Sequence, residues 1–185
     1  MSLVESNMLP LGTKAPDFNL PDTVSDSNMS YQKIKGLKGT VVIFSCNHCP
    51  FVVHLNNEIV SIANQYINRG IGFAAISSND VENYNEDSPD KMKIVAKVLQ
   101  YPFPYLYDAS QEVAKAYDAA CTPDFYLFDD NDALVYRGRL DGARPGNDVP
   151  ITGADLRSAL DAVLLGIKDI QPQIPSAGCN IKWKS

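Results

Sequence analysis

Apolar residues recur along this chain with two different periods, and each period predicts a different kind of element. Continuous β-branched and aromatic runs at 40–44 and 71–77 predict strands buried on both faces. From about 48 to 68 the apolar residues recur at spacings of three and four, which predicts a long amphipathic helix stopped by Gly70. A second helix is expected near 89–100. Because strand and helix alternate, we expect a sheet with a parallel component.

Shorter elements are predicted on either side of this centre. The stretch 12–21 alternates between prolines, as a short edge strand would, and 31–38 is expected to be a polar connector. In the later part of the chain, 103–107 predicts a strand and 110–117 a helix that begins at a serine cap. The segments 124–128 and 133–140 predict a hairpin of two antiparallel strands, and 153–165 predicts a final helix.

The two ends of the chain are expected to lie outside the core. About 1–11 forms a polar arm, and 170–185 contains three prolines and predicts a tail that lies extended on the surface. Trp183 is expected to pack this tail onto the domain. With these two flanks, residues 1–185 are interpreted as a single α/β domain.

Composition agrees with one domain and excludes some partners. The chain has 185 residues, of which 45% are apolar, enough for one substantial core. A net charge of -6 with scattered lysines argues against nucleic acid or an anionic membrane as a partner. The first eight residues lack a basic region and a long apolar stretch, and no segment is apolar enough to span a bilayer, so we expect a cytoplasmic protein.

Four cysteines are too few and too unevenly spaced for a disulfide scaffold, so reactivity or burial must explain them. Cys46 and Cys49 stand three positions apart where the buried strand meets the long helix. This spacing is expected to place both sulfurs in the first helical turn, where unpaired N–H groups stabilise a thiolate. We therefore predict a redox pair, with Cys46 nearer solvent as the nucleophile and Cys49 as the resolving thiol.

The residues around the pair are expected to modulate it. Asn47 and His48 lie between the two cysteines, and a protonated His48 would stabilise the Cys46 thiolate. Pro50 belongs in the first helical turn because it cannot donate a backbone hydrogen bond. If Cys46 is the helix cap, however, Pro50 falls too far along and predicts an irregular helix start.

A metal site is the alternative interpretation of the cysteines. The pair could be half of a zinc site, but no second pair with this spacing exists, and the other candidate ligands, His54, Cys121 and Cys179, are scattered. The redox interpretation is therefore favoured, with neither a metal nor a cofactor. The aspartates at 129, 130 and 132 lack the spacing of a calcium loop and predict a solvated turn.

The motif at 46–52, Cys-Asn-His-Cys-Pro-Phe-Val, and the later Thr122-Pro123 resemble the thioredoxin-like redoxin group, which also contains the alkyl hydroperoxide reductase and thiol-specific antioxidant proteins. The resemblance covers nearly the whole chain. Within the group, the Asn-His dipeptide and the tail at 178–183 resemble a bacterial subfamily described as thioredoxin family proteins. The resemblance implies a thioredoxin-like fold, a central mixed sheet flanked by helices, with an N-terminal strand extension.

The resemblance also assigns roles and exposes departures. It implies that Pro123 is a cis-proline facing the cysteines and that the Thr122 backbone pairs with an extended substrate strand. Thioredoxins bury a carboxylate in the strand before the cysteines as a proton acceptor, whereas 40–45 contains no acid. Peroxiredoxins place a proline and a threonine before the reactive cysteine, and 41–45 contains neither.

The remaining cysteines are possible auxiliary thiols. Cys121 directly precedes Thr122, and burial is favoured over a relay role. Cys179 on the tail could fold back as a resolving partner or could anchor the tail, and both alternatives stay open.

The function predicted is that of a thiol-disulfide oxidoreductase that uses the Cys46 and Cys49 pair. Its partners would be protein or small-molecule disulfides, together with a thiol reductant such as thioredoxin or glutathione. One alternative is a thiol-dependent peroxidase that uses Cys46. Another is a redox-sensing or binding module that is oxidised once, without turnover.

Overall fold

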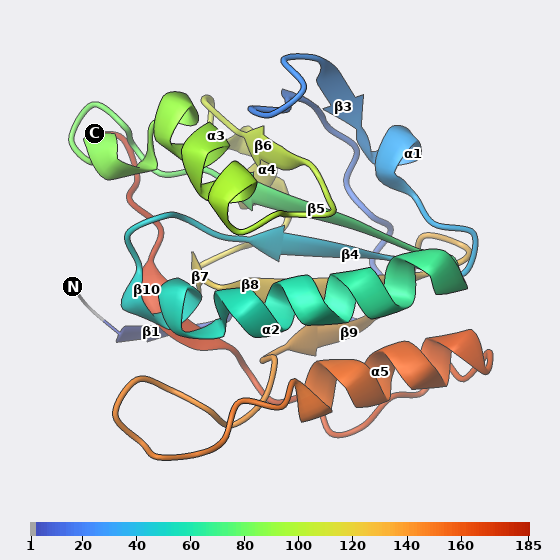
Figure 1. The fold of residues 1–185 in the computed structure, drawn as a ribbon. Coiled ribbons are helices and arrows are strands. Elements are labelled where there is room, and N and C mark those ends of the chain that lie inside the picture. The colour runs from blue at the N-terminus through green and yellow to red at the C-terminus, as the bar shows by residue number, and fades with distance from the viewer. Residues whose placement is uncertain (1–2) are drawn as a thin grey trace.

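The central sheet of the fold is built around β4 (Gly39–Phe44), the first of the buried runs. β4 pairs in parallel with β5 (Ile71–Ser77) and antiparallel with β8 (Asp124–Asp129). In this computed structural model, which describes residues 3–185, β6 (Tyr105–Tyr107) and β9 (Leu134–Gly138) complete a five-stranded sheet of order β6-β5-β4-β8-β9 (Figure 1). β6 is parallel to β5 and β9 antiparallel to β8, so the sheet is mixed, as predicted.

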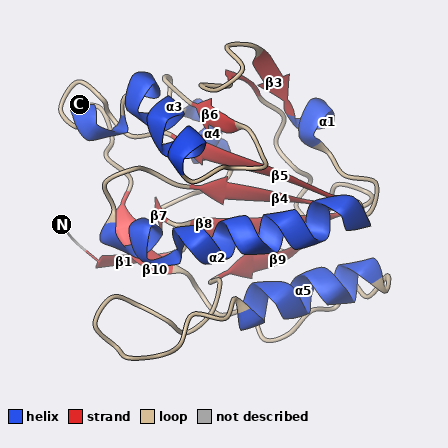
Figure 2. Ribbon diagram, viewed as in Figure 1, coloured by secondary structure: helices blue, strands red, loops and turns tan. Residues whose placement is uncertain are grey.

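Helices cover both faces of this sheet (Figure 2). One face carries three helices: α2 (Pro50–Tyr66), α3 (Pro89–Val98) and α5 (Ala154–Leu164). The other face carries two short ones: α1 (Tyr31–Ile34) and α4 (Glu112–Ala116). Val41 and Ile43 of β4 pack in the first core, and Val42 and Phe44 pack in the second. Both sides of β4 are therefore apolar, which explains its uninterrupted hydrophobic run.

The long helix begins later than its sequence suggested. Cys49 is the N-cap of α2 and Pro50 is the first helical residue, so Cys46 and Cys49 both precede the first turn. The expectation that both sulfurs lie within that turn was wrong. Pro50 falls where a missing N–H costs nothing, so the start is regular. α2 continues into η1 (Ile67–Arg69), and Gly70, with φ 93°, ends it in the left-handed conformation, as predicted.

The predicted surface tail was wrong for its middle segment. Residues Ala177–Asn180 form β10, the middle strand of a second, three-stranded sheet, between β1 (Leu3–Glu5) and β7 (Cys121–Thr122). The prolines did indicate an extended chain, but here the chain is paired on both edges. The predicted N-terminal arm contains β1; its residues 1 and 2 lie outside the described residues.

Local departures from the sequence patterns have identifiable causes. Of the predicted edge strand at 12–21, only β2 (Asn19–Pro21) is a strand, and it pairs with β3 (Asn28–Ser30) outside the central sheet. The expected polar connector holds α1, because Tyr31 packs edge-on against Phe128. The helix α4 is capped by Gln111 rather than by a serine.

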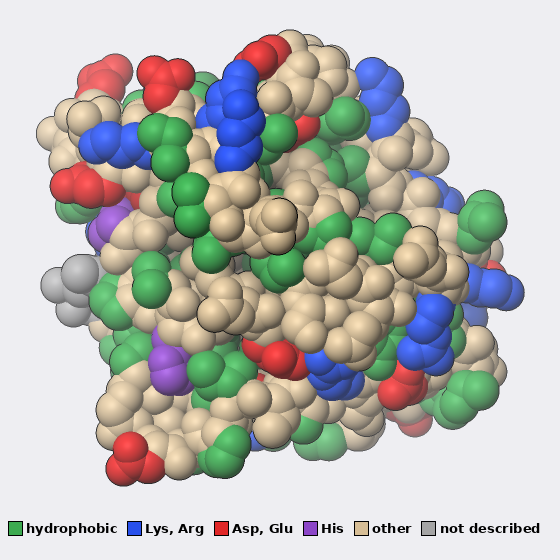
Figure 3. All heavy atoms as spheres, viewed as in Figure 1, with side chains coloured by type: hydrophobic (Ala, Val, Ile, Leu, Met, Phe, Trp, Pro, Cys, Tyr) green, Lys and Arg blue, Asp and Glu red, His purple; other side chains and the backbone are tan. Residues whose placement is uncertain are grey.

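The C-terminal end also packs differently from the prediction. Trp183 is 44% exposed, whereas Ile181 is 1% exposed and anchors the tail to the core beside α4. The polar loop at 79–89 contains the short helix η2 (Asn85–Asp87). Within residues 3–185, no helix combines the length and the apolar character needed to cross a membrane. Lysine and arginine side chains are interspersed with acidic ones on the face seen in Figure 3.

Candidate active site

The two cysteines of the motif lie where four segments of the chain converge. They follow the C-terminal end of β4, and α2 begins directly after Cys49. β7 and β10 approach the same point from distant parts of the sequence (Figure 1). Cys46, Cys49 and Cys179 share one buried cluster with Val52. All four cysteines of the chain are thiols in this structure.

Thr122 contacts both members of the pair. The Sγ of Cys46 lies 3.4 Å from the Thr122 hydroxyl, and the Sγ of Cys49 lies 3.2 Å from the Thr122 carbonyl oxygen. The peptide bond from Thr122 to Pro123 is cis, as the resemblance implies. However, β10 already occupies the edge of β7, with Cys179 opposite Thr122. The predicted pairing of the Thr122 backbone with a substrate strand therefore requires the tail to leave that edge.

The two thiols of the pair differ in the direction in which their pKa is shifted. The pKa of Cys49 is lowered to about 5 because the Cys46 thiol donates a hydrogen bond to it, with further stabilisation from the Cys179 thiol and the Val52 N–H. The pKa of Cys46 is raised by that same hydrogen bond, by burial and by the charge of Asp87. The hydrogen bond between the two thiols therefore lowers the pKa of Cys49 and raises that of Cys46, whereas the sequence predicted the stabilised thiolate on Cys46.

Solvent exposure does not separate the two cysteines as predicted either. Cys46 is only 2% exposed and Cys49 is 0% exposed. The prediction that Cys46 lies near solvent was wrong for this conformation, because the tail and the loop around Asp87 close over the pair. Access to either sulfur requires one of these segments to move.

Asp87 is the residue of the site that sequence reasoning missed. Its side chain is fully buried, and its Oδ2 lies 2.7 Å from Nδ1 of His48. Its Oδ1 accepts hydrogen bonds from the backbone N–H groups of Asn47 at 2.7 Å and His48 at 3.3 Å. Asp87 thus fixes the backbone between the two cysteines. Nothing in the sequence distinguishes it from the other acids of its loop.

His48 and Asn47 are held rather than free to turn toward the sulfurs. The His48 ring stacks on Tyr84 with centroids 5.8 Å apart, while its Nδ1 faces Asp87. The Asn47 amide donates to the Glu86 carbonyl and accepts from the Tyr105 hydroxyl. A His48 ring nitrogen also lies within 4.8 Å of the Cys46 sulfur, so the electrostatic role predicted for His48 stays a prediction.

The same network reaches the C-terminal tail. The Asn79 amide donates to Oδ2 of Asp87 at 2.7 Å, and its oxygen accepts the Lys182 N–H at 2.8 Å. The Lys182 ammonium lies 5.6 Å from the centre of the Tyr84 ring, on which His48 stacks. The motif, the loop at 79–87 and the tail therefore form one connected unit.

Metal binding was considered on the sequence, and the structure brings together a different set of ligands. In the described part of the chain, one group has ligand atoms within 4.8 Å of one another: Cys46, His48 and Asp87. The Asp87 oxygens already accept from Asn47, His48 and Asn79, so this carboxylate is engaged in holding the loop. This group shares only Cys46 with the predicted pair, so it is a different set of ligands from the zinc site considered on the sequence.

Cys121 stands apart from the other three cysteines. Its sulfur is fully buried, with the carbonyl oxygens of Pro123 and Ser176 at 3.9 and 4.0 Å. Its pKa is raised by burial and by the charge of Asp124. Adjacent residues of a strand point to opposite faces, so Cys121 turns away from the pair that Thr122 contacts. This placement agrees with the expected buried role.

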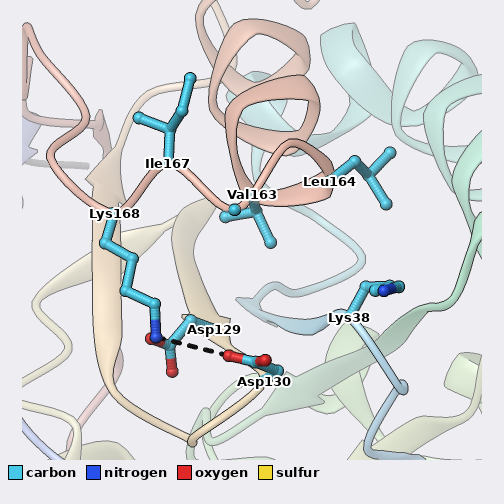
Figure 4. Close-up of a pocket in the computed structure, with 8 residues that line it drawn as sticks. Lys38, Asp129, Asp130, Val163, Leu164, Ile167 and Lys168 are labelled. Carbon is cyan, nitrogen blue, oxygen red and sulfur yellow. Dashed lines mark hydrogen bonds and ion pairs between the residues drawn. The ribbon is translucent and has the colours of Figure 1, made fainter.

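The pocket drawn in Figure 4 lies at the other end of the sheet. The register pairs Gly39 with Asp129, at the start of β4, whereas the cysteines follow the end of β4. In this pocket the Lys168 ammonium lies 2.7 Å from Asp129 and 3.5 Å from Asp130. Asp129 is buried, so the prediction of a solvated acidic turn was wrong at this residue. This pocket contributes nothing to the cysteine site.

A mixed sheet with a cis-proline beside a cysteine pair at a helix start defines a thioredoxin-like protein. The chain belongs to the Redoxin family, whose model matches residues 10–156. The comparison with curated proteins found no match.

Solved structures extend this likeness to both ends of the chain. An uncharacterized conserved protein of Geobacillus kaustophilus is 55% identical, with TM-score 0.98, covering 100% of this chain and 97% of its own. A hypothetical protein of Sinorhizobium meliloti 1021 is 46% identical, with TM-score 0.95 and 98% of each chain covered. A thiol-disulfide interchange protein of Chlorobium tepidum TLS shares the fold at 19% identity, with TM-score 0.63 and coverage of 84% of this chain and 99% of its own.

Proposed function

We propose that the protein is a thiol-disulfide oxidoreductase that works through Cys46 and Cys49. One observation carries the proposal: both sulfurs lie just before the start of α2 and contact Thr122, whose bond to Pro123 is cis, and the Cys46 thiol lowers the pKa of Cys49. Membership of the Redoxin family supports a thioredoxin-like oxidoreductase at a coarser level.

The proposed reaction uses the shared proton of the pair. Cys46 passes its proton to Cys49 and attacks a disulfide of the substrate, so that a mixed disulfide forms and one substrate thiolate leaves. Cys49 then attacks the Cys46 sulfur, gives its proton to the leaving substrate sulfur and closes the Cys46–Cys49 disulfide. The substrate gains two electrons and the pair loses two. Cys46 takes the first step because the Cys49 sulfur is already in contact with the Thr122 carbonyl oxygen and the Cys179 sulfur, which an incoming disulfide would have to displace.

The proposed partners are disulfides of proteins or small molecules, and a thiol reductant such as thioredoxin or glutathione returns the pair to the dithiol. A cytoplasmic location, which the sequence predicts, would keep such a reductant at hand. The geometry adds no support for the peroxidase alternative. The Thr122 hydroxyl lies 3.4 Å from the Cys46 sulfur, but residues 41–45 contain neither the proline nor the threonine that peroxiredoxins place before the reactive cysteine.

Turnover with an excess of dithiothreitol and insulin as the disulfide substrate tests the proposal. Wild type is expected to accelerate insulin reduction, and Cys46→Ala and Cys49→Ala are each expected to fall to the rate of dithiothreitol alone. Cys121→Ala is the matched control, because it removes a buried thiol that does not touch the pair. Wild-type turnover of hydrogen peroxide without insulin reduction would favour the peroxidase, and one oxidation without turnover would favour the sensor.

A further inference from the structure

Cys179 contacts the sulfur that the proposed function leaves oxidised. It is 130 positions from Cys49 in sequence, yet the two Sγ atoms lie 2.7 Å apart. A disulfide bond needs about 2.05 Å, so a small shift would join them. The thiol of Cys179 also helps to lower the pKa of Cys49. Cys49 therefore has sulfur neighbours on two sides, Cys46 and Cys179.

The backbone fixes Cys179 in this position from both edges of its strand. β10 pairs Cys179 with Leu3 of β1 on one side and with Thr122 of β7 on the other. Gly178 permits the close approach, because a Cβ at this position would collide with the Thr122 carbonyl oxygen. The contact between the sulfurs is thus imposed by the sheet rather than by a flexible side chain.

Side-chain hydrogen bonds hold the end of the same segment. The Gln111 amide donates to the Lys182 carbonyl at 2.9 Å, and its oxygen accepts the Lys184 N–H at 2.9 Å. Asn79 and Gln111 are both buried polar residues, and the side chain of each makes a hydrogen bond to the tail. A surface anchor would not need this many buried partners.

We propose that Cys179 is a third redox thiol, which takes over the disulfide from the Cys46 and Cys49 pair. This proposal rests on the proposed function, because the Cys46–Cys49 disulfide is its starting point. The Cys179 sulfur attacks the Cys49 sulfur, the Cys46–Cys49 bond breaks and a Cys49–Cys179 bond forms. The proton leaves Cys179 and ends on Cys46. No outside oxidant or reductant is needed, since one disulfide is exchanged for another.

The exchange has two consequences for the reaction. Cys46 returns to the thiol state while the two-electron oxidation is stored deeper, on Cys49 and Cys179. The new bond also ties β10 to the start of α2, next to the Thr122 edge that a substrate strand would need. The oxidised protein would then exclude a second disulfide substrate until a reductant opens the Cys49–Cys179 bond.

Disulfide mapping of the wild-type protein tests the proposal directly. The reduced protein is oxidised with diamide until the products stop changing, quenched in acid, alkylated with N-ethylmaleimide and digested with trypsin. Cys46 and Cys49 then share the peptide 39–69, Cys179 lies in 169–182 and Cys121 in 116–137. The expected product links 39–69 to 169–182. A disulfide confined to 39–69, with Cys179 alkylated, would overturn the proposal.

Variants assign the linked sulfur and separate the two proposals. Cys46→Ala is expected to keep the linkage and Cys49→Ala to lose it; the reverse pattern would contradict the contact that the structure assigns. Cys121→Ala is expected to map like wild type. Because diamide replaces the substrate, the linkage can form in a protein that does not reduce insulin. Insulin turnover with no linkage would sink only this proposal, whereas a linkage with no turnover would sink only the proposed function.

Discussion

At the scale of single residues, Asp87 determines how the motif presents its sulfurs. It is fully buried, holds the backbone of Asn47 and His48, and raises the pKa of Cys46 through its charge. Asparagine would separate these effects, because its oxygen could still accept from the Asn47 and His48 N–H groups, while the charge and the hydrogen bond from the Asn79 amide would be lost.

Asp87→Asn is therefore expected to lower the pKa of Cys46, on the order of one unit. The measurement is the pH profile of Cys46 alkylation by iodoacetamide, made in the Cys49→Ala background so that one thiol of the pair titrates alone. Glu86→Gln, an exposed neighbour in η2, is the matched control. An alkylation profile that does not move in Asp87→Asn would show that the carboxylate positions the loop without an electrostatic effect on the thiol.

Asp124 is a second buried acid, and it predicts how stability depends on pH. Burial raises its pKa to about 7 from 3.8, although the Tyr126 hydroxyl donates to it at 3.0 Å. An acid whose pKa is raised by folding binds its proton more tightly in the folded protein. The contribution of Asp124 to the free energy of unfolding is therefore complete below pH 3.8 and is lost as the pH rises through about 7. The loss is at most about 1.4 kcal/mol per pH unit within this window.

Asp124→Asn should remove this pH dependence. Urea denaturation is made at pH 5 and pH 8. Because other groups such as Cys49 also titrate in this window, the change in the free energy of unfolding from pH 5 to pH 8 is expected to be less favourable in wild type than in Asp124→Asn. Asp148→Asn changes an exposed aspartate in the loop before α5 and should behave like wild type. If wild type and Asp124→Asn respond identically to pH, the carboxylate is already ionised at pH 5.

At the scale of elements, β10 depends on Gly178. Gly178→Ala would place a methyl group against the Thr122 carbonyl oxygen, so β10 should shift away from β7. Amide hydrogen exchange in 177–180 and alkylation of Cys49 in the reduced native protein are both expected to accelerate. Gly142→Ala is the control, because its nearest contacts would lie at 3.8 Å. Unchanged rates in Gly178→Ala would mean that the tail relaxes without leaving Thr122.

The elements also divide into those that the sequence predicts and those that it does not. β4, β5 and α2 carry strong periodic patterns because their side chains enter large cores. β1, β7 and β10 are only two to four residues long, and partners far away in sequence stabilise them. No local pattern encodes such a sheet. The cysteine pair and Thr122–Pro123 could be predicted from short sequence motifs, but their contact with Cys179 depends on this non-local pairing.

At the scale of the whole molecule, the two ends of the chain close the site. β1 from the N-terminal arm and β10 from the tail pair with each other, and β10 in turn pairs with β7. The tail strand β10 thus places Cys179 against the Cys49 sulfur, and β1 pairs with β10 from its other side. The same closure would let the redox state of Cys49 influence the stability of the entire fold.

A Cys49–Cys179 disulfide would close a loop spanning 130 positions, whereas Cys46 and Cys49 are only three positions apart. Long-loop closure stabilises by about 5 kcal/mol in the chain-entropy account, so oxidation should raise the melting temperature of wild type by on the order of 10 °C. Calorimetry of the diamide-oxidised and reduced forms measures this difference. Cys121→Ala should retain it. Cys179→Ala, which can close only the short loop, should lose most of it, and an equal rise there would place the disulfide on Cys46 and Cys49.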